Sequence, residues 1–162
     1  MTVLSEPVSR DAVISTCGRY RYRLSRVWDG HSLPLVWIML NPSTADAVDD
    51  DPTIRRCIGF ARREGCGGIE VMNLFALRAT DPRALRSVRD PVGPENDRWI
   101  GEVLHPHSRV IAAWGRNGDY LGRNKFVVRN LRAMGIRIEC LGDRPNHPLY
   151  IKGDQPLVEL AA

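Results

Sequence analysis

The chain has 162 residues, of which 43% are hydrophobic and 26% are charged, a balance typical of one globular domain. No run of 18 apolar residues occurs, which excludes a membrane-spanning helix, and residues 1–13 lack the basic and apolar regions of a secretion signal. We therefore expect a single cytoplasmic domain over residues 1–162, monomeric by default, with no membrane partner.

The positive charge is carried almost entirely by arginine. The net charge is +4, and Lys125 and Lys152 are the only lysines among 23 basic residues. Guanidinium groups bind phosphate in a forked geometry and stack on bases, so this composition permits a nucleic-acid or nucleotide partner. A bias in genomic composition explains the arginines equally well.

The four cysteines give no sign of a metal site. Cys17, Cys57, Cys66 and Cys140 form no CxxC pair, which argues against zinc, and their spacing fits no familiar iron–sulfur pattern. We expect reduced and mostly buried thiols, and we expect neither a metal nor another cofactor.

The first third of the chain predicts two strands and a helix. Residues 19–28 alternate large and polar side chains, as in an antiparallel strand, and residues 35–40 are continuously apolar, as in a buried parallel strand. We therefore treat residues 1–34 as a lead-in to a core over residues 35–162. Asp51 can cap a helix that continues to Gly65.

The rest of the chain alternates between strands and helices. The predicted strands are 69–75, 109–115 and 136–142, the predicted helices are 94–104 and 120–134, and a short helix is expected at the end of the loop 143–160. Such alternation predicts a parallel sheet with helices on both faces.

Polar residues follow the predicted parallel strands. Asn41, with Pro42 and Ser43, follows the first strand, Asn73 lies near the end of the second, and His147 lies in the loop after the fourth. The third strand ends on Trp114, Gly115 and Arg116. Because ligands of parallel sheets bind at the carboxyl ends of the strands, we expect these residues to form one site.

Each of these residues also has a structural explanation. Asparagine favours turns, so Asn41 and Asn73 could cap local backbone, and His147 could be an ordinary loop residue. The acidic run 49–51 fits a solvated loop with a helix cap, although carboxylates are also the ligands that Mg²⁺ prefers. Both interpretations of that run stay open.

Four stretches carry resemblances to known families. "MLNPSTADAVDDDPTIRRC", "VMNLFALRATDP", "DPVGPEND" and "NHPLYI" resemble a bacterial and phage family that is catalogued as a domain of unknown function. The order of "MLNP", "VMNLF", "VIAAWG" and "NHPLY" is also similar, more distantly, to the uracil-DNA glycosylase superfamily. The second resemblance implies a three-layer α/β/α fold around a four-stranded parallel sheet, here with one antiparallel N-terminal strand added.

The glycosylase resemblance also implies roles for the residues. Asn41 would orient the water that attacks the sugar, Asn73 would bind the base edge, and His147 would donate a hydrogen bond to the base oxygen. The remaining substrate-binding residues would be Pro42, Ser43, Phe75 and Gly115, with Trp114 as a second candidate for an aromatic wall. The phosphate contacts would come from Arg78, Arg83, Arg116 and Arg144.

The sequence departs from the glycosylase motifs at two places. Met39 replaces the glycine that opens the first motif, and Leu149 replaces the serine that follows the His-Pro pair. Three functions therefore stay open: a DNA glycosylase-like enzyme that removes a damaged, modified or mismatched base, an enzyme that acts on free nucleotides or nucleosides, and a non-catalytic nucleic-acid-binding module.

Overall fold

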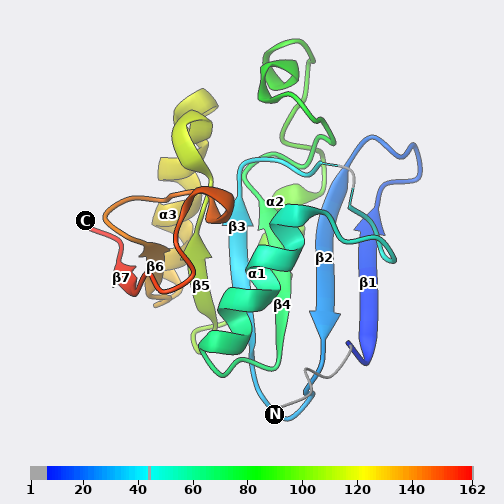
Figure 1. The fold of residues 1–162 in the computed structure, drawn as a ribbon. Helices are drawn as coiled ribbons and strands as arrows, with labels where there is room; N and C mark the ends of the chain where they lie inside the picture. The colour runs from blue at the N-terminus through cyan, green and yellow to red at the C-terminus, as the bar shows by residue number, and fades with distance from the viewer. Residues whose placement is uncertain (1–6, 44, 162) are drawn as a thin grey trace.

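The protein is an α/β domain built on one mixed seven-stranded sheet, seen in the computed structural model, which describes residues 7–43 and 45–161. The strands lie in the order β1-β2-β4-β3-β5-β6-β7 (Figure 1). Their bounds are Ser9–Ile14 (β1), Arg21–Val27 (β2), Pro34–Met39 (β3), Gly68–Asn73 (β4), Arg109–Ala112 (β5), Ile138–Leu141 (β6) and Leu157–Glu159 (β7).

The middle of the sheet is parallel and its margins are antiparallel. β3 pairs in parallel with β4 and β5, and β5 pairs in parallel with β6. β1, β2 and β7 are all antiparallel to their neighbours. The carboxyl ends of β3, β4, β5 and β6 therefore meet at one edge, as the alternation of strands and helices predicts.

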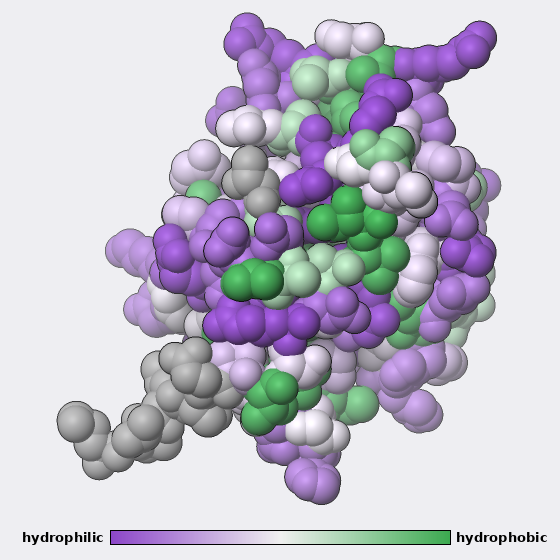
Figure 2. Space-filling view, turned by 90° about the vertical axis from the view of Figure 1, so that its right-hand side faces the viewer, coloured by the Kyte–Doolittle hydropathy of each residue, from purple (hydrophilic) through white to green (hydrophobic). Residues whose placement is uncertain are grey.

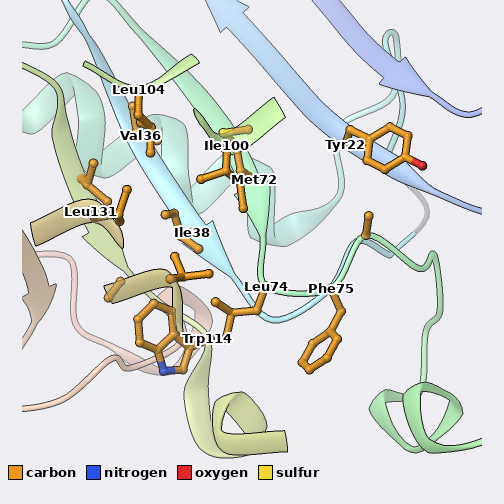
Figure 3. Packing of buried hydrophobic residues seen from close by; sticks show 14 of the residues in the cluster. Tyr22, Val36, Ile38, Met72, Leu74, Phe75, Ile100, Leu104, Trp114 and Leu131 are labelled. Carbon is orange, nitrogen blue, oxygen red and sulfur yellow. The ribbon is translucent and has the colours of Figure 1, made fainter. Parts of the chain in front are cut away.

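Helices cover both faces of the sheet. α1 (Pro52–Arg63) lies on one face and packs its buried residues, including Cys57 and Phe60, against Trp37 of β3. α2 (Asn96–Val103) and α3 (Arg123–Ala133) cover the other face, where Ile100 and Leu131 join the core cluster drawn in Figure 3. The architecture is therefore three-layered, and each sheet face buries its own core.

The margins of the sheet differ from the sequence prediction. The lead-in holds two antiparallel strands rather than one, because β1 also pairs along β2. β1 escaped prediction because its first half is exposed and its second half only partly buried, so it lacks a clear apolar stripe. Figure 2, which faces this side of the molecule, shows hydrophobic and hydrophilic groups interspersed there.

The C-terminal half corrects two further predictions. The expected final helix is instead the strand β7, three residues long, which pairs with the free edge of β6. The helix expected from residue 120 begins only at Arg123, after a 3₁₀ segment at Gly115–Gly122. Leu121 and Gly122 have φ angles of +54° and +65°, and this left-handed backbone stops an α-helix from extending backward through them.

Two expectations, one about membrane-spanning helices and one about the cysteine thiols, can be compared with the fold. No helix in the described part of the chain is long and apolar enough to cross a membrane. All four cysteines carry free thiols, and Cys57, Cys66 and Cys140 are buried while Cys17 is exposed. The prediction of mostly buried thiols is confirmed.

Candidate functional site

Asn41, the second residue after β3, joins two of the loops at the carboxyl edge of the sheet. Its amide nitrogen Nδ2 donates to the carbonyl oxygens of Ala79, at 2.9 Å, and Leu77, at 3.4 Å. These carbonyls belong to the loop that follows β4. The carbonyl of Pro42, at 3.2 Å, is a third acceptor for Nδ2, so the NH₂ group fixes the orientation of the amide and its oxygen Oδ1 is the group left to offer to a ligand.

Asn73, the last residue of β4, is enclosed. Its side chain is 2% exposed, and its Nδ2 is a buried donor without a hydrogen-bond partner among the described residues. Its main-chain oxygen accepts a bond of 2.9 Å from Asn96, which lies at the start of α2. A buried donor without a partner costs about 1–3 kcal/mol, so this amide is poised to gain from an acceptor.

His147 lies in the loop after β6, before a single 3₁₀ turn at Pro148–Tyr150. Its Nδ1 accepts a hydrogen bond from the backbone N–H of Leu149 at 3.2 Å, so in the neutral ring the proton lies on Nε2. Burial lowers the pKa of His147 below its ordinary value, and the Asp51 carboxylate opposes this shift by a smaller amount. The ring is therefore a neutral donor at physiological pH.

Ser43 and Asp51 connect this edge to α1. Asp51 caps the helix, with Oδ1 accepting from the N–H of Ile54 at 2.8 Å, which confirms the predicted cap. Its other oxygen, Oδ2, accepts from the hydroxyl of Ser43 at 2.5 Å. Arg56 of α1 in turn donates to the carbonyl of Pro148, at 3.2 Å, and to that of Ile151. The β3 loop, the start of α1 and the His147 loop thus form one connected unit.

Two buried arginines from β2 hold the loop over residues 45–50, a feature that sequence reasoning missed. Arg26 is fully buried and donates to Oδ1 of Asp50 at 2.8 Å and to the carbonyl of Asp46 at 2.6 Å. Arg21 donates to the carbonyl of Ala45 at 2.7 Å, and burial lowers its pKa to about 10. Their spacing within β2 carried no signal, since arginines in a strand usually face solvent.

The two aromatic candidates lie away from Asn41 and Asn73. Phe75 and Trp114 belong to the core cluster on the face that α2 and α3 cover, and the Phe75 ring packs on Tyr120 with centroids 5.6 Å apart. Met39, in contrast, faces α1 within the other core cluster. Gly115 is at the edge itself, where its N–H donates to the carbonyl of Pro145 at 2.8 Å and joins the β5 and β6 loops.

The four arginines expected to contact phosphate differ in their surroundings. Arg83 and Arg144 are exposed and paired with the neighbouring carboxylates of Asp81 and Asp143, at 2.8 Å and 3.3 Å. Arg78 donates to the carbonyl of Gly18 at 3.3 Å, and Arg116 is exposed after β5. Exposed ion pairs of this kind contribute little to stability.

The comparison with protein families decides the membership of the chain. Residues 21–149 match the model of a family described as a protein of unknown function, DUF1643. The chain belongs to the DUF1643 family. No curated protein matches it, and no solved structure does.

The DUF1643 match includes the whole candidate site. The matched range, residues 21–149, contains the five site residues Asn41, Ser43, Asp51, Asn73 and His147, whereas β1 and β7 lie outside it.

The acidic run 49–51 contacts protein groups through the side chains of Asp50 and Asp51. No group of three metal-ligating side chains occurs among the residues that the structure describes. The amides of Asn41 and Asn73 and the imidazole of His147 are therefore the candidate functional groups.

Proposed function

We propose that this DUF1643 protein hydrolyses the N-glycosidic bond of a nucleobase in DNA, in the manner of a DNA glycosylase acting on a damaged, modified or mismatched base. The observation that carries the proposal is the arrangement of His147, whose Nδ1 is occupied by the Leu149 N–H and whose Nε2 holds the proton. A neutral imidazole with a fixed donor at the carboxyl edge of a parallel sheet suits a reaction in which a base leaves as an anion.

The reaction assigns a task to each of three side chains. The bond between the sugar C1′ and the base nitrogen breaks, and its electron pair leaves with the base. His147 donates from Nε2 to the base oxygen on which negative charge develops, and a fixed donor of this kind typically contributes about 3–4 kcal/mol. Asn41, oriented through its NH₂ group, accepts a hydrogen bond from the attacking water through Oδ1. The water oxygen bonds to C1′ and its proton passes to solvent.

Asn73 supplies recognition of the base in this proposal. Its unpartnered Nδ2 donates to an acceptor on the base edge. This hydrogen bond offsets the cost of keeping a buried donor without an acceptor. Since Nδ2 of Asn73 has no access to solvent, a base can reach it only when the protein groups that cover it move.

The test is a cleavage assay with labelled oligonucleotides that carry uracil, hypoxanthine, 5-hydroxymethyluracil or a mismatch, in single and double strands. Alkali converts each abasic site into a strand break. The matched variant is His147→Asn, whose Oδ1 replaces Nδ1 as acceptor for the Leu149 N–H while the Nε2 donor is lost. We expect breaks with the unmodified protein and a loss of about 100-fold or more in the variant. No break on any substrate overturns the proposal.

One observation favours the alternative of a free nucleotide or nucleoside as substrate. Two of the four arginines that would follow a DNA backbone, Arg83 and Arg144, are paired with carboxylates one or two residues away in the chain. Release of a free base from a nucleoside monophosphate, without cleavage of any oligonucleotide, would establish that alternative. DNA binding that persists in Asn41→Ala and His147→Asn, with no product from either substrate, would establish a non-catalytic binding module.

A further inference from the structure

A hollow lies at the opposite end of the sheet from the candidate site. It has a volume of about 400 Å³ and is bounded by the start of β3, the middle of β4 and the C-terminal part of α2. Its lining residues include Arg23, Pro34, Glu70, Trp99, Glu102 and His105. Pockets of about 300–1,000 Å³ are the usual size for small ligands. Neither Asn41 nor His147 touches this hollow, so its chemistry is independent of the proposed reaction.

The hollow contains an arginine that is already oriented. Arg23 of β2 pairs with Glu70 of β4 through two parallel bonds, Nε to Oε2 at 2.7 Å and Nη2 to Oε1 at 2.6 Å. The Glu70 side chain is 9% exposed, whereas that of Arg23 is 32% exposed. The two bonds use one edge of the guanidinium, so Nη1 and the second hydrogen of Nη2 form a second donor edge.

The ion pair between the nearly buried Glu70 carboxylate and the partly exposed Arg23 in the lining of the hollow needs an explanation. The Glu70 carboxylate lines the hollow beside Val36 and Val103, and removing most of a carboxylate from water carries a desolvation cost that its pairing with Arg23 must offset. A pair of hydrophobic residues would pack this position at least as well. The pair is understandable if the carboxylate serves to fix Arg23 and the free edge of Arg23 serves to bind a ligand.

The other walls complete a site for an anionic group on a flat body. Trp99 provides an aromatic surface, with Val36 and Val103 beside it. His105 Nδ1 accepts from the backbone N–H of His107 at 3.3 Å, so its neutral ring donates from Nε2, and Ser108 adds a hydroxyl. The donors and the aromatic wall thus line one hollow.

We propose that this hollow binds a small aromatic carboxylic acid, with its carboxylate on the free edge of Arg23 and its ring against Trp99. Planar carboxylates match the fork of a guanidinium, which gives two parallel bonds. A singly charged group suits the site better than phosphate does. Glu70 already balances the charge of Arg23, and Glu102 adds a negative charge at the rim.

The probe is benzoate, titrated into the full chain and followed through the indole N–H signals of the protein in ¹H–¹⁵N spectra. We expect saturable shifts of the Trp99 indole signal, identified by its loss in Trp99→Phe, and weaker shifts with benzamide, which has no charge. Inorganic phosphate is expected to leave the signal in place. No shift with benzoate, or a shift as large with phosphate, overturns the proposal.

The decisive variant is Arg23→Lys, which keeps a positive charge beside Glu70 but removes the second donor edge. We expect benzoate to bind at least about tenfold more weakly, because a lysine cannot form the paired bonds. The control is Arg137→Lys at an exposed residue paired with Glu159, where binding stays unchanged. Equal binding by Arg23→Lys and the unmodified protein, with thermal unfolding showing both folded, also overturns the proposal.

Discussion

The hydroxyl of Ser43 and the carboxylate of Asp51 lie 2.5 Å apart, so the loop that leaves β3 is tied to the residue that caps α1. One carboxylate therefore satisfies both a backbone donor of the helix and a side chain of the loop. The position of the loop and the start of the helix are thereby coupled, and the consequence can be measured separately for each partner.

Removal of the cap is expected to destabilise the protein more than removal of the hydroxyl. Asp51→Ala loses both bonds and should lower the free energy of unfolding by about 2 kcal/mol, and Ser43→Ala by about 1 kcal/mol. Urea unfolding measures both values, with the exposed Asp49→Ala as control. If Asp49→Ala proves as harmful as Asp51→Ala, the cap has no special role.

Arg26 is expected to be among the most sensitive residues of the chain. Its guanidinium is fully buried against Asp50 and the Asp46 carbonyl, so Arg26→Met removes both bonds, leaves Asp50 paired with Arg10 alone, and should cost about 3 kcal/mol. The exposed Arg129→Met serves as control. In a double-mutant cycle, Asp50→Asn should reduce the effect of Arg26→Met. Additive effects of the two substitutions would show that the pair is not coupled.

The stability of the protein should depend on the protonation of His147. Its pKa is lowered from the ordinary value of 6.5 in the folded state. As pH falls below 6.5, the unfolded chain takes up a proton that the folded chain does not, so the free energy of unfolding decreases until the folded pKa is reached. His147→Asn should remove this part of the pH dependence in urea unfolding, whereas the exposed His107→Asn controls for the loss of a histidine. If the free energy of unfolding of His147→Asn depends on pH as that of the unmodified protein does, the lowered pKa of His147 is contradicted.

Two glycines should respond in opposite directions to alanine. A Cβ at Gly67 would lie 2.1 Å from the carbonyl oxygen of Asp29 and 2.6 Å from that of Ser32, so Gly67→Ala should cost about 3 kcal/mol or more. Gly59, within α1, has open space at the same position, and Gly59→Ala should stabilise by about 0.5–1 kcal/mol. Thermal unfolding compares the two, and a stable Gly67→Ala would show that the loop at Asp29 can shift freely.

The parallel centre of the fold could be predicted because its signals are local. The apolar run of β3, the cap at Asp51 and the polar residue that ends β4 each arise within a few residues of sequence. β7 could not be predicted in this way, because its three residues are a strand only through pairing with β6. The same holds for the contacts of Arg21 and Arg26, which bind loop carbonyls about 20 residues away in the chain.

The candidate site was predicted in part for a related reason. The strand-end rule brought Asn41, Asn73 and His147 to one edge without any knowledge of tertiary contacts. The rule could not reveal that the Phe75 side chain lies on the sheet face that α2 and α3 cover. The alternation of side chains between the two faces breaks down where a strand passes into a loop. The rule also gave Asp51 only the role of a cap, while the contact with Ser43 depends on how the loop folds back.

The outer strands β1 and β7 flank a parallel centre and lie outside the residues that match the DUF1643 family. A fragment restricted to residues 21–149 would expose the N–H and C=O groups along the free edges of β2 and β6. Unpaired edges of this kind recruit other chains, so the fragment should self-associate more strongly than the full chain. Light scattering of the two proteins would show whether the two short outer strands protect the sheet from edge-to-edge aggregation.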